Sequence, residues 1–162
     1  DADAFQTASV LAAALRKIDF DLVVCGEGSA DRYSQQVGLL VGALLGLPVV
    51  NATGSVRAEG DALLVERVLE NEVEVLEIAP PAVVSMTSDA VLPRIPQLKD
   101  ILAAGKKPVT TWSLDEVGGI PESPVETVSV KAPASIARKG IVLEGATDEN
   151  IGELVSGIRA SR

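Results

Sequence analysis

The sequence of 162 residues is long enough for one domain with a hydrophobic core, and its 47% apolar and 23% charged residues are ordinary for a globular α/β protein. A net charge of −9 and only 2% aromatic residues argue against nucleic-acid binding, which needs clustered basic residues and stacking platforms. The lack of histidine makes hydrolytic triads and zinc sites poor candidates, and no apolar run reaches the roughly 20 residues that span a membrane.

The first third of the chain predicts an alternation of helix and strand. Apolar residues at helical spacing predict a helix over Ala4–Lys17, followed by a short buried strand over Asp21–Cys25. A loop with glycine and serine comes next, and a second helix is predicted over about Tyr33–Leu45, with Gly46 where a C-terminal cap belongs. This order is typical of an open, doubly wound, mostly parallel Rossmann-like α/β sheet.

The middle of the chain changes to shorter extended segments. Three strands are expected around Ser55–Ala58, Ala62–Leu69 and Val73–Ile78, separated by turns at Gly60 and Asn71. Valine and glutamate alternate in the third segment, which indicates a half-exposed antiparallel strand. We interpret this region as an antiparallel hairpin excursion from the main sheet.

After the hairpin, the chain is expected to return to the buried sheet at Ala82–Met86. A proline-containing linker then leads to a helix of about Gln97–Ala104, and Val109–Trp112 is predicted as a last short strand. Residues 113–140 are rich in proline, serine, glycine and glutamate and are expected to form an extended arm. Thr147 is a good N-cap for a final amphipathic helix.

The loop between the first strand and the second helix is the main candidate for a binding site. Ligands of open α/β sheets bind outside the carboxyl ends of the strands, where this loop is expected. Gly26 and Gly28 allow the backbone to approach a ligand, and Ser29 and Asp31 are expected to cap the following helix. Uncovered N–H groups at the start of a helix favour an anionic phosphate.

Twelve consecutive residues make up this candidate cofactor-binding loop. They are Gly26, Glu27, Gly28, Ser29, Ala30, Asp31, Arg32, Tyr33, Ser34, Gln35, Gln36 and Val37. A plain strand-to-helix turn is the alternative, because the spacing fits neither the dinucleotide fingerprint nor the P-loop. An ATP-using enzyme is disfavoured because the loop has no lysine or histidine, although Arg32 leaves that reading open.

The spacing from Gly26 through Asp31 to Gln36-Val37-Gly38 resembles the adenine-nucleotide loop of electron-transfer flavoprotein β subunits. Three further blocks follow in the order of that family: Val65-Glu66-Arg67, Pro81-Ala82-Val83-Val84, and the segment from Pro93-Arg94 to Lys106-Lys107. The run Gln35–Gly42 resembles the FixA-like branch. Together these blocks cover almost all of the chain, and the resemblance implies an adenine nucleotide α hydrolase-like sheet.

The resemblance also implies an electron-transfer subunit and not an enzyme. Such a β subunit pairs with an α subunit that holds most of the redox FAD, and it binds AMP, or a second FAD in bifurcating members, through the loop from Gly26 to Val37. The pair would carry electrons from an acyl-CoA or other dehydrogenase to a quinone oxidoreductase or related acceptor. Leu98 would anchor the docked dehydrogenase; a place in a helix core is the alternative. A structural or sensing module that binds nucleotide without electron transfer is the other function considered.

The chain begins at Asp1 and runs almost at once into a helix, which is typical of the middle of a domain. We therefore expect a nucleotide-binding α/β domain over residues 1–112 that is incomplete at its N-terminus. Residues 113–162 are expected to form an arm and a helix that pack on the partner subunit. No catalytic or metal-ligating residue is predicted. The single cysteine, Cys25, suits a reducing compartment, and the expected location is the bacterial cytoplasm.

Overall fold

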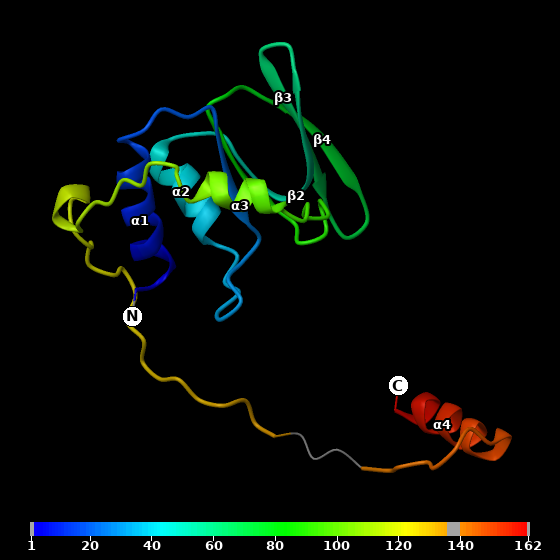
Figure 1. Cartoon of the computed structure of the whole chain (residues 1–162). Coiled ribbons are helices and arrows are strands. Elements are labelled where there is room, and N and C mark those ends of the chain that lie inside the picture. The colour runs from blue at the N-terminus through cyan, green and yellow to red at the C-terminus, as the bar shows by residue number, and fades with distance from the viewer. Residues whose placement is uncertain (1, 136–139, 162) are drawn as a thin grey trace. The chain divides into compact units, whose positions relative to one another are not determined.

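The computed structural model describes residues 2–135 and 140–161, and the chain divides into two compact units at Glu126/Thr127. The first unit holds α1 (Ala4–Leu15), β1 (Leu22–Gly26), α2 (Val37–Leu45), β2 (Val49–Glu59), β3 (Ala62–Val68), β4 (Val73–Ile78), β5 (Ala82–Met86), α3 (Leu98–Ala104) and the 3-10 turn η1 (Asp115–Val117) (Figure 1). The second holds α4 (Asp148–Ala160).

The strands form one mixed sheet in the order β1-β5-β2-β3-β4. β5 lies between β1 and the first residues of β2 and is parallel to both, whereas β3 and β4 are antiparallel to their neighbours. The expected open, Rossmann-like α/β fold with an antiparallel hairpin is therefore confirmed. β2 is longer than predicted, because an irregularity at Ala52, with φ of +50°, lets it pair first with β5 and then with β3.

The two faces of β5 carry separate apolar clusters, because successive side chains of a strand point to opposite faces. On one face, Val83 packs with Ala8 of α1 and Val41 of α2, and the two helices lie side by side (Figure 1). On the other face, Val84 packs with Val50 and Val65. The sheet is thus covered by α1 and α2 on the face of Val83, and these helices frame the end of β1.

The second helix begins later than its periodicity predicts. Tyr33 and Gln35 have φ angles of +45° and +55°, and this left-handed backbone cannot continue a right-handed helix. α2 therefore starts at Val37, so the predicted start at Tyr33 is wrong. Its predicted end is confirmed, because Gly46 caps the helix with a φ of +69°.

The described residues of the first unit that follow β5 include one α-helix and no further strand. The predicted strand Val109–Trp112 is wrong: those residues form no strand, and Val109 is exposed. The helix α3 is confirmed at Leu98–Ala104, with no buried residue. Pro121 belongs to the expected arm, and its carbonyl accepts a hydrogen bond from Nε2 of Gln6 at 3.0 Å. This contact joins that part of the arm to α1.

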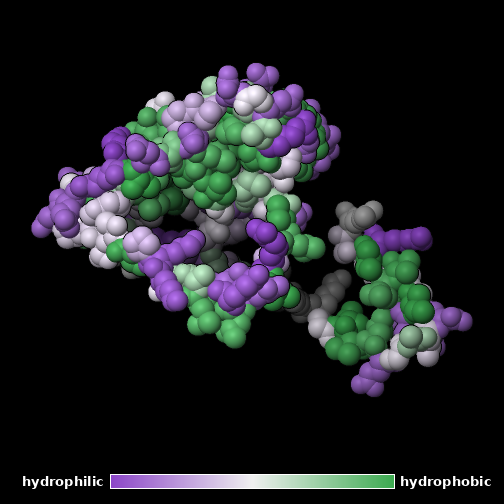
Figure 2. Space-filling model, turned by 45° about the horizontal axis from the view of Figure 1, so that its top comes forward, coloured by the Kyte–Doolittle hydropathy of each residue, from purple (hydrophilic) through white to green (hydrophobic). Residues whose placement is uncertain are grey.

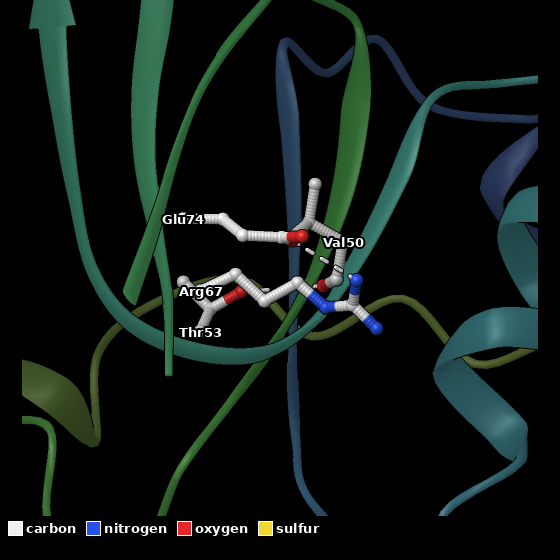
Figure 3. A network of polar contacts seen from close by, with 4 residues as sticks. All are labelled: Val50, Thr53, Arg67 and Glu74. Atoms are coloured by element: carbon white, nitrogen blue, oxygen red, sulfur yellow. Dashed lines mark hydrogen bonds and ion pairs between the residues drawn. The ribbon is translucent and has the colours of Figure 1, made fainter. Parts of the chain in front are cut away.

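The hairpin is half-exposed, as predicted, but in β4 the valines of the alternating pattern lie on the exposed face, opposite to the usual apolar-in arrangement. Val73 and Val75 are exposed, whereas the alternate side chains of β4 are partly buried. Among these, Glu74 accepts a hydrogen bond from Nη1 of Arg67 at 3.1 Å, and Thr53 donates to the carbonyl of Val50 beside them (Figure 3). Because Arg67 belongs to β3 and Glu74 to β4, their ion pair is a structural contact between neighbouring strands.

The second unit consists of an extended segment and α4. Thr147 accepts a hydrogen bond from the backbone N–H of Asn150, which confirms the predicted N-cap. Figure 2 shows broad apolar surface on this unit beside charged residues. Part of the predicted arm, residues 136–139, lies outside the described residues, and packing of the arm on a partner stays a prediction. In the described ranges, no helix has the length and apolar character to cross a membrane.

Candidate functional site

The candidate loop leaves the carboxyl end of β1 beside the carboxyl end of β5. The hydroxyl of Ser85 donates to the carbonyl of Gly26 at 3.0 Å and joins the two strand ends. On one side of the loop lies a hollow of about 370 Å³, walled by α1, the end of β1 and the start of α2. A second hollow of about 370 Å³ lies between the loop and the end of β5. The loop thus occupies the position at which open α/β sheets bind ligands.

The structure brings most of the predicted loop residues together around the first hollow. Those that line it are Gly26, Glu27, Gly28, Ser29, Ser34, Gln35, Gln36 and Val37. Tyr33 lines the second hollow instead. Ala30, Asp31 and Arg32 lie on the exposed turn of the loop.

The predicted capping of α2 by Ser29 and Asp31 is wrong. The N-cap is Gln36, and no side chain caps the helix there. Instead, the Ser29 hydroxyl and the backbone N–H of Arg32 hold the pKa of Asp31 below its ordinary value. The first N–H groups of α2 are therefore left without a side-chain cap, next to the hollow that Val37 and Gly38 line.

Hydrogen bonds within the loop set its shape. The two oxygens of Glu27 accept from the hydroxyl of Tyr33 and from Nε2 of Gln35, each at 2.9 Å. The backbone N–H of Tyr33 donates to the carbonyl of Ser29 at 3.0 Å. A Cβ on Gly28 would come within 2.9 Å of the Tyr33 ring, so this glycine is required by a close approach within the loop.

Close packing of α2 on β1 places the uncapped N-terminus of α2 beside the first hollow. A Cβ on Gly38 would lie 3.2 Å from the Cβ of Cys25, which leaves no room for a larger residue without movement. Cys25 is half-buried in the apolar cluster under α2, and burial raises the pKa of its thiol. Cys25 therefore packs as a small apolar residue with a neutral thiol.

The first hollow has a neutral or acidic lining. Glu27 is the one charged side chain among the described residues that line it, and its oxygens already accept hydrogen bonds. The donors available along its lining are the hydroxyl of Ser34, the amide of Gln36 and backbone N–H groups, since the Ser29 hydroxyl is engaged by Asp31. Such donors suit the hydroxyls of a ribose and a phosphate held at a helix end.

Sequence reasoning missed the residues that other elements contribute. Thr7 and Leu11 of α1 line the first hollow, and Met86, Thr87 and Ser88 line the second. Thr87 and Ser88 follow directly after the predicted strand Ala82–Met86. They could have been predicted because ligands of open α/β sheets bind at the carboxyl ends of strands. The residues of α1 depend on how that helix packs, which no local pattern shows.

The predicted docking residue Leu98 lies outside the loop, at the start of α3. Its side chain is 72% exposed, so the alternative of a helix core residue is wrong. Leu92 and Ile95, in the preceding linker, are 90% and 93% exposed. These three residues form an exposed apolar segment around Pro93 and Pro96, whereas docking itself stays a prediction.

Comparison with known families decides what kind of protein carries this site. A model described as the electron transfer flavoprotein domain matches residues 1–117, a range that includes the loop, all five strands and α3. The chain belongs to the electron transfer flavoprotein domain family. Proteins with this domain transfer electrons in partnership with other proteins and are not catalytic enzymes. The expected membership of the electron-transfer flavoproteins is thereby confirmed, whereas the β subunit and the FixA-like branch stay predictions.

Proposed function

We propose that the chain is the β subunit of an electron-transfer flavoprotein of the FixA-like branch, whose loop from Gly26 to Val37 holds the adenosine and phosphate of AMP or of a second FAD. The observation that carries the proposal is the uncapped start of α2 beside the hollow at the end of β1. Unpaired N–H groups and the positive end of the helix dipole favour a phosphate in that position.

The space at Gly26 supports this placement. A Cβ built on this glycine would meet nothing within 4 Å, and the residue lines both hollows. The backbone therefore leaves room for a ligand at the strand end. Ser34 and Gln36 supply side-chain donors and acceptors for the ribose and phosphate oxygens. When bound in the complex, FAD would supply the redox chemistry, and residues of this chain would bind and orient the adenine nucleotide.

The exposed apolar segment supports the partner part of the proposal. Leu98 and Ile95 stay in solvent in the described chain, where Pro93 and Pro96 restrict the backbone of the linker before α3. A stiff apolar anchor loses little conformational entropy on docking. In this proposal the segment docks an acyl-CoA or other dehydrogenase, the α subunit carries the redox FAD, and a quinone oxidoreductase or related acceptor receives the electrons in the bacterial cytoplasm.

The nucleotide part is tested by co-expressing the chain with an α subunit of the same family. Heat release followed by chromatography measures the adenine nucleotide that the complex holds beyond the flavin of the α subunit. We expect AMP or additional FAD in the wild type and a loss in Gly26→Leu, because the new side chain fills the hollow. Gly105→Ala is the control, since its Cβ would have ordinary contacts at 3.8 and 3.9 Å. A wild-type complex without this extra nucleotide would contradict the proposal.

The electron-transfer part needs a separate measurement. The flavin of the complex should be reduced by an acyl-CoA dehydrogenase with its substrate or by NADH. A complex that retains adenine nucleotide but whose flavin is reduced by neither would favour the alternative, a nucleotide-binding structural or sensing module. Failure of the chain to bind any α subunit would remove the electron-carrier proposal.

A further inference from the structure

One carboxylate joins three parts of the loop. Glu27 stands directly after β1, and its two oxygens accept hydrogen bonds from Tyr33 and Gln35, six and eight residues farther along, each at 2.9 Å. Both acceptor atoms are thus engaged by side chains of the loop itself. Hydrogen bonds to a charged group are stronger than those between neutral groups.

The two residues that Glu27 holds have the unusual backbone of the loop. Tyr33 and Gln35 are left-handed, with φ of +45° and +55°, although neither is glycine. Such conformations cost energy in residues with a side chain and persist where surrounding contacts enforce them. The contacts here are the two bonds to Glu27, together with the Tyr33 ring over Gly28.

This backbone decides where α2 begins. The apolar periodicity of the sequence would allow a helix from Tyr33, but the left-handed residues delay its start to Val37. A helix that began at Tyr33 would pair the N–H groups of Val37 and Gly38 with carbonyls one turn earlier. Those N–H groups would then be lost to a phosphate at the hollow.

We infer that Glu27 is the positioning residue of the nucleotide loop: it holds Tyr33 and Gln35 so that the start of α2 stays open to the phosphate. This inference rests on the proposed function and assigns to Glu27 a role that needs no contact with the nucleotide. We call the two hydrogen bonds from Tyr33 and Gln35 to Glu27 the clamp. Without the clamp, α2 extends back to Tyr33, and its first N–H groups are no longer available to the phosphate.

Two substitutions at one position separate the clamp from the charge. Glu27→Ala removes both hydrogen bonds. Glu27→Gln removes the charge but keeps the clamp, because its amide oxygen accepts from Tyr33 and its NH₂ donates to a reversed Gln35 amide. The affinity of the complex with the α subunit for AMP and FAD, measured by calorimetry after removal of bound nucleotide, is expected to fall about tenfold or more in Glu27→Ala and to stay within about threefold in Glu27→Gln.

A structural measurement accompanies the affinities. Amide hydrogen exchange of Val37 and Gly38 should slow in Glu27→Ala as the helix extends, and should stay at the wild-type rate in Glu27→Gln. Equal losses of affinity in the two variants would overturn the inference, because they would point to the charge and not to the clamp. Undiminished affinity in Glu27→Ala would overturn it and leave the proposed function standing. A wild-type complex that binds neither nucleotide would overturn both.

Discussion

Gly42 of α2 lies so close to Val49 of β2 that a Cβ on the glycine would come within 2.7 Å of the Cβ of the valine. Gly38, four residues earlier, stands on the same side of the helix and approaches Cys25 of β1. This pair of glycines allows the backbone of α2 to lie directly on the sheet. The position of the helix start, and therefore of the candidate site, depends on that close contact.

We predict that Gly42→Ala lowers the free energy of unfolding by about 1–3 kcal/mol, because the overpacking outweighs the gain in helix propensity of about 1 kcal/mol. Urea unfolding followed by circular dichroism measures the change. Gly157→Ala in α4 is the matched control, since its Cβ would meet nothing within 4 Å. A urea unfolding midpoint for Gly42→Ala at or above that of the wild type would show that the space between Gly42 and Val49 accommodates a methyl group.

The ion pair between Arg67 and Glu74 should contribute little to stability. Their side chains are 32% and 37% exposed, so water screens the pair, and Nε of Arg67 is buried without a hydrogen-bond partner. A double-mutant cycle with Arg67→Met and Glu74→Gln should give a coupling energy of about 0.5–1 kcal/mol. A coupling above about 2 kcal/mol would mean that the pair behaves as a buried one.

Tyr33 should titrate at higher pH than a free tyrosine. Its hydrogen bond to Glu27 raises the pKa of the phenol above the ordinary 10.0. Because the folded-state pKa is raised, this contribution to stability is fully present below about pH 10 and is lost as the pH rises through the folded-state value.

The only tyrosine of the chain makes this measurement direct, since the phenolate absorbance of the isolated chain reports Tyr33 alone. Glu27→Ala should bring the titration toward the ordinary value, because both the hydrogen bond and the neighbouring negative charge are gone. Glu116 accepts a hydrogen bond from Ser113 and not from Tyr33, so Glu116→Gln should leave the pKa of Tyr33 unchanged. Identical curves for the wild type and Glu27→Ala would refute the contact between Tyr33 and Glu27.

Leu98→Ala should slow electron transfer without affecting folding. The side chain is 72% exposed, so its truncation leaves no cavity, and the unfolding midpoint should not move. If Leu98 anchors the dehydrogenase, the rate of flavin reduction at limiting partner concentration should fall about tenfold, which corresponds to about 1.4 kcal/mol of docking energy. Val109→Ala, at a residue that is 87% exposed, is the control. An unchanged rate in Leu98→Ala would exclude this anchor.

Much of the architecture could be predicted from the sequence because it depends on local patterns. The apolar run of β1, the cap at Gly46 and the N-cap at Thr147 each follow from residues close in the chain. The expected strand Ala82–Met86 matches β5 for the same reason. The predicted strand Val109–Trp112 failed because apolar residues form a strand only where another strand pairs with them.

Periodicity and turn residues encode the α/β class, the order of most elements and the loop between β1 and α2, because each depends on residues close in the chain. The start of α2 depends instead on contacts made in the folded chain. Its periodicity continues back to Tyr33, but the Glu27 carboxylate, brought to the end of β1 by the sheet, holds Tyr33 and Gln35 in left-handed conformations. Contacts across six and eight residues thus override a helical pattern, and they leave the start of α2 uncapped beside the hollow.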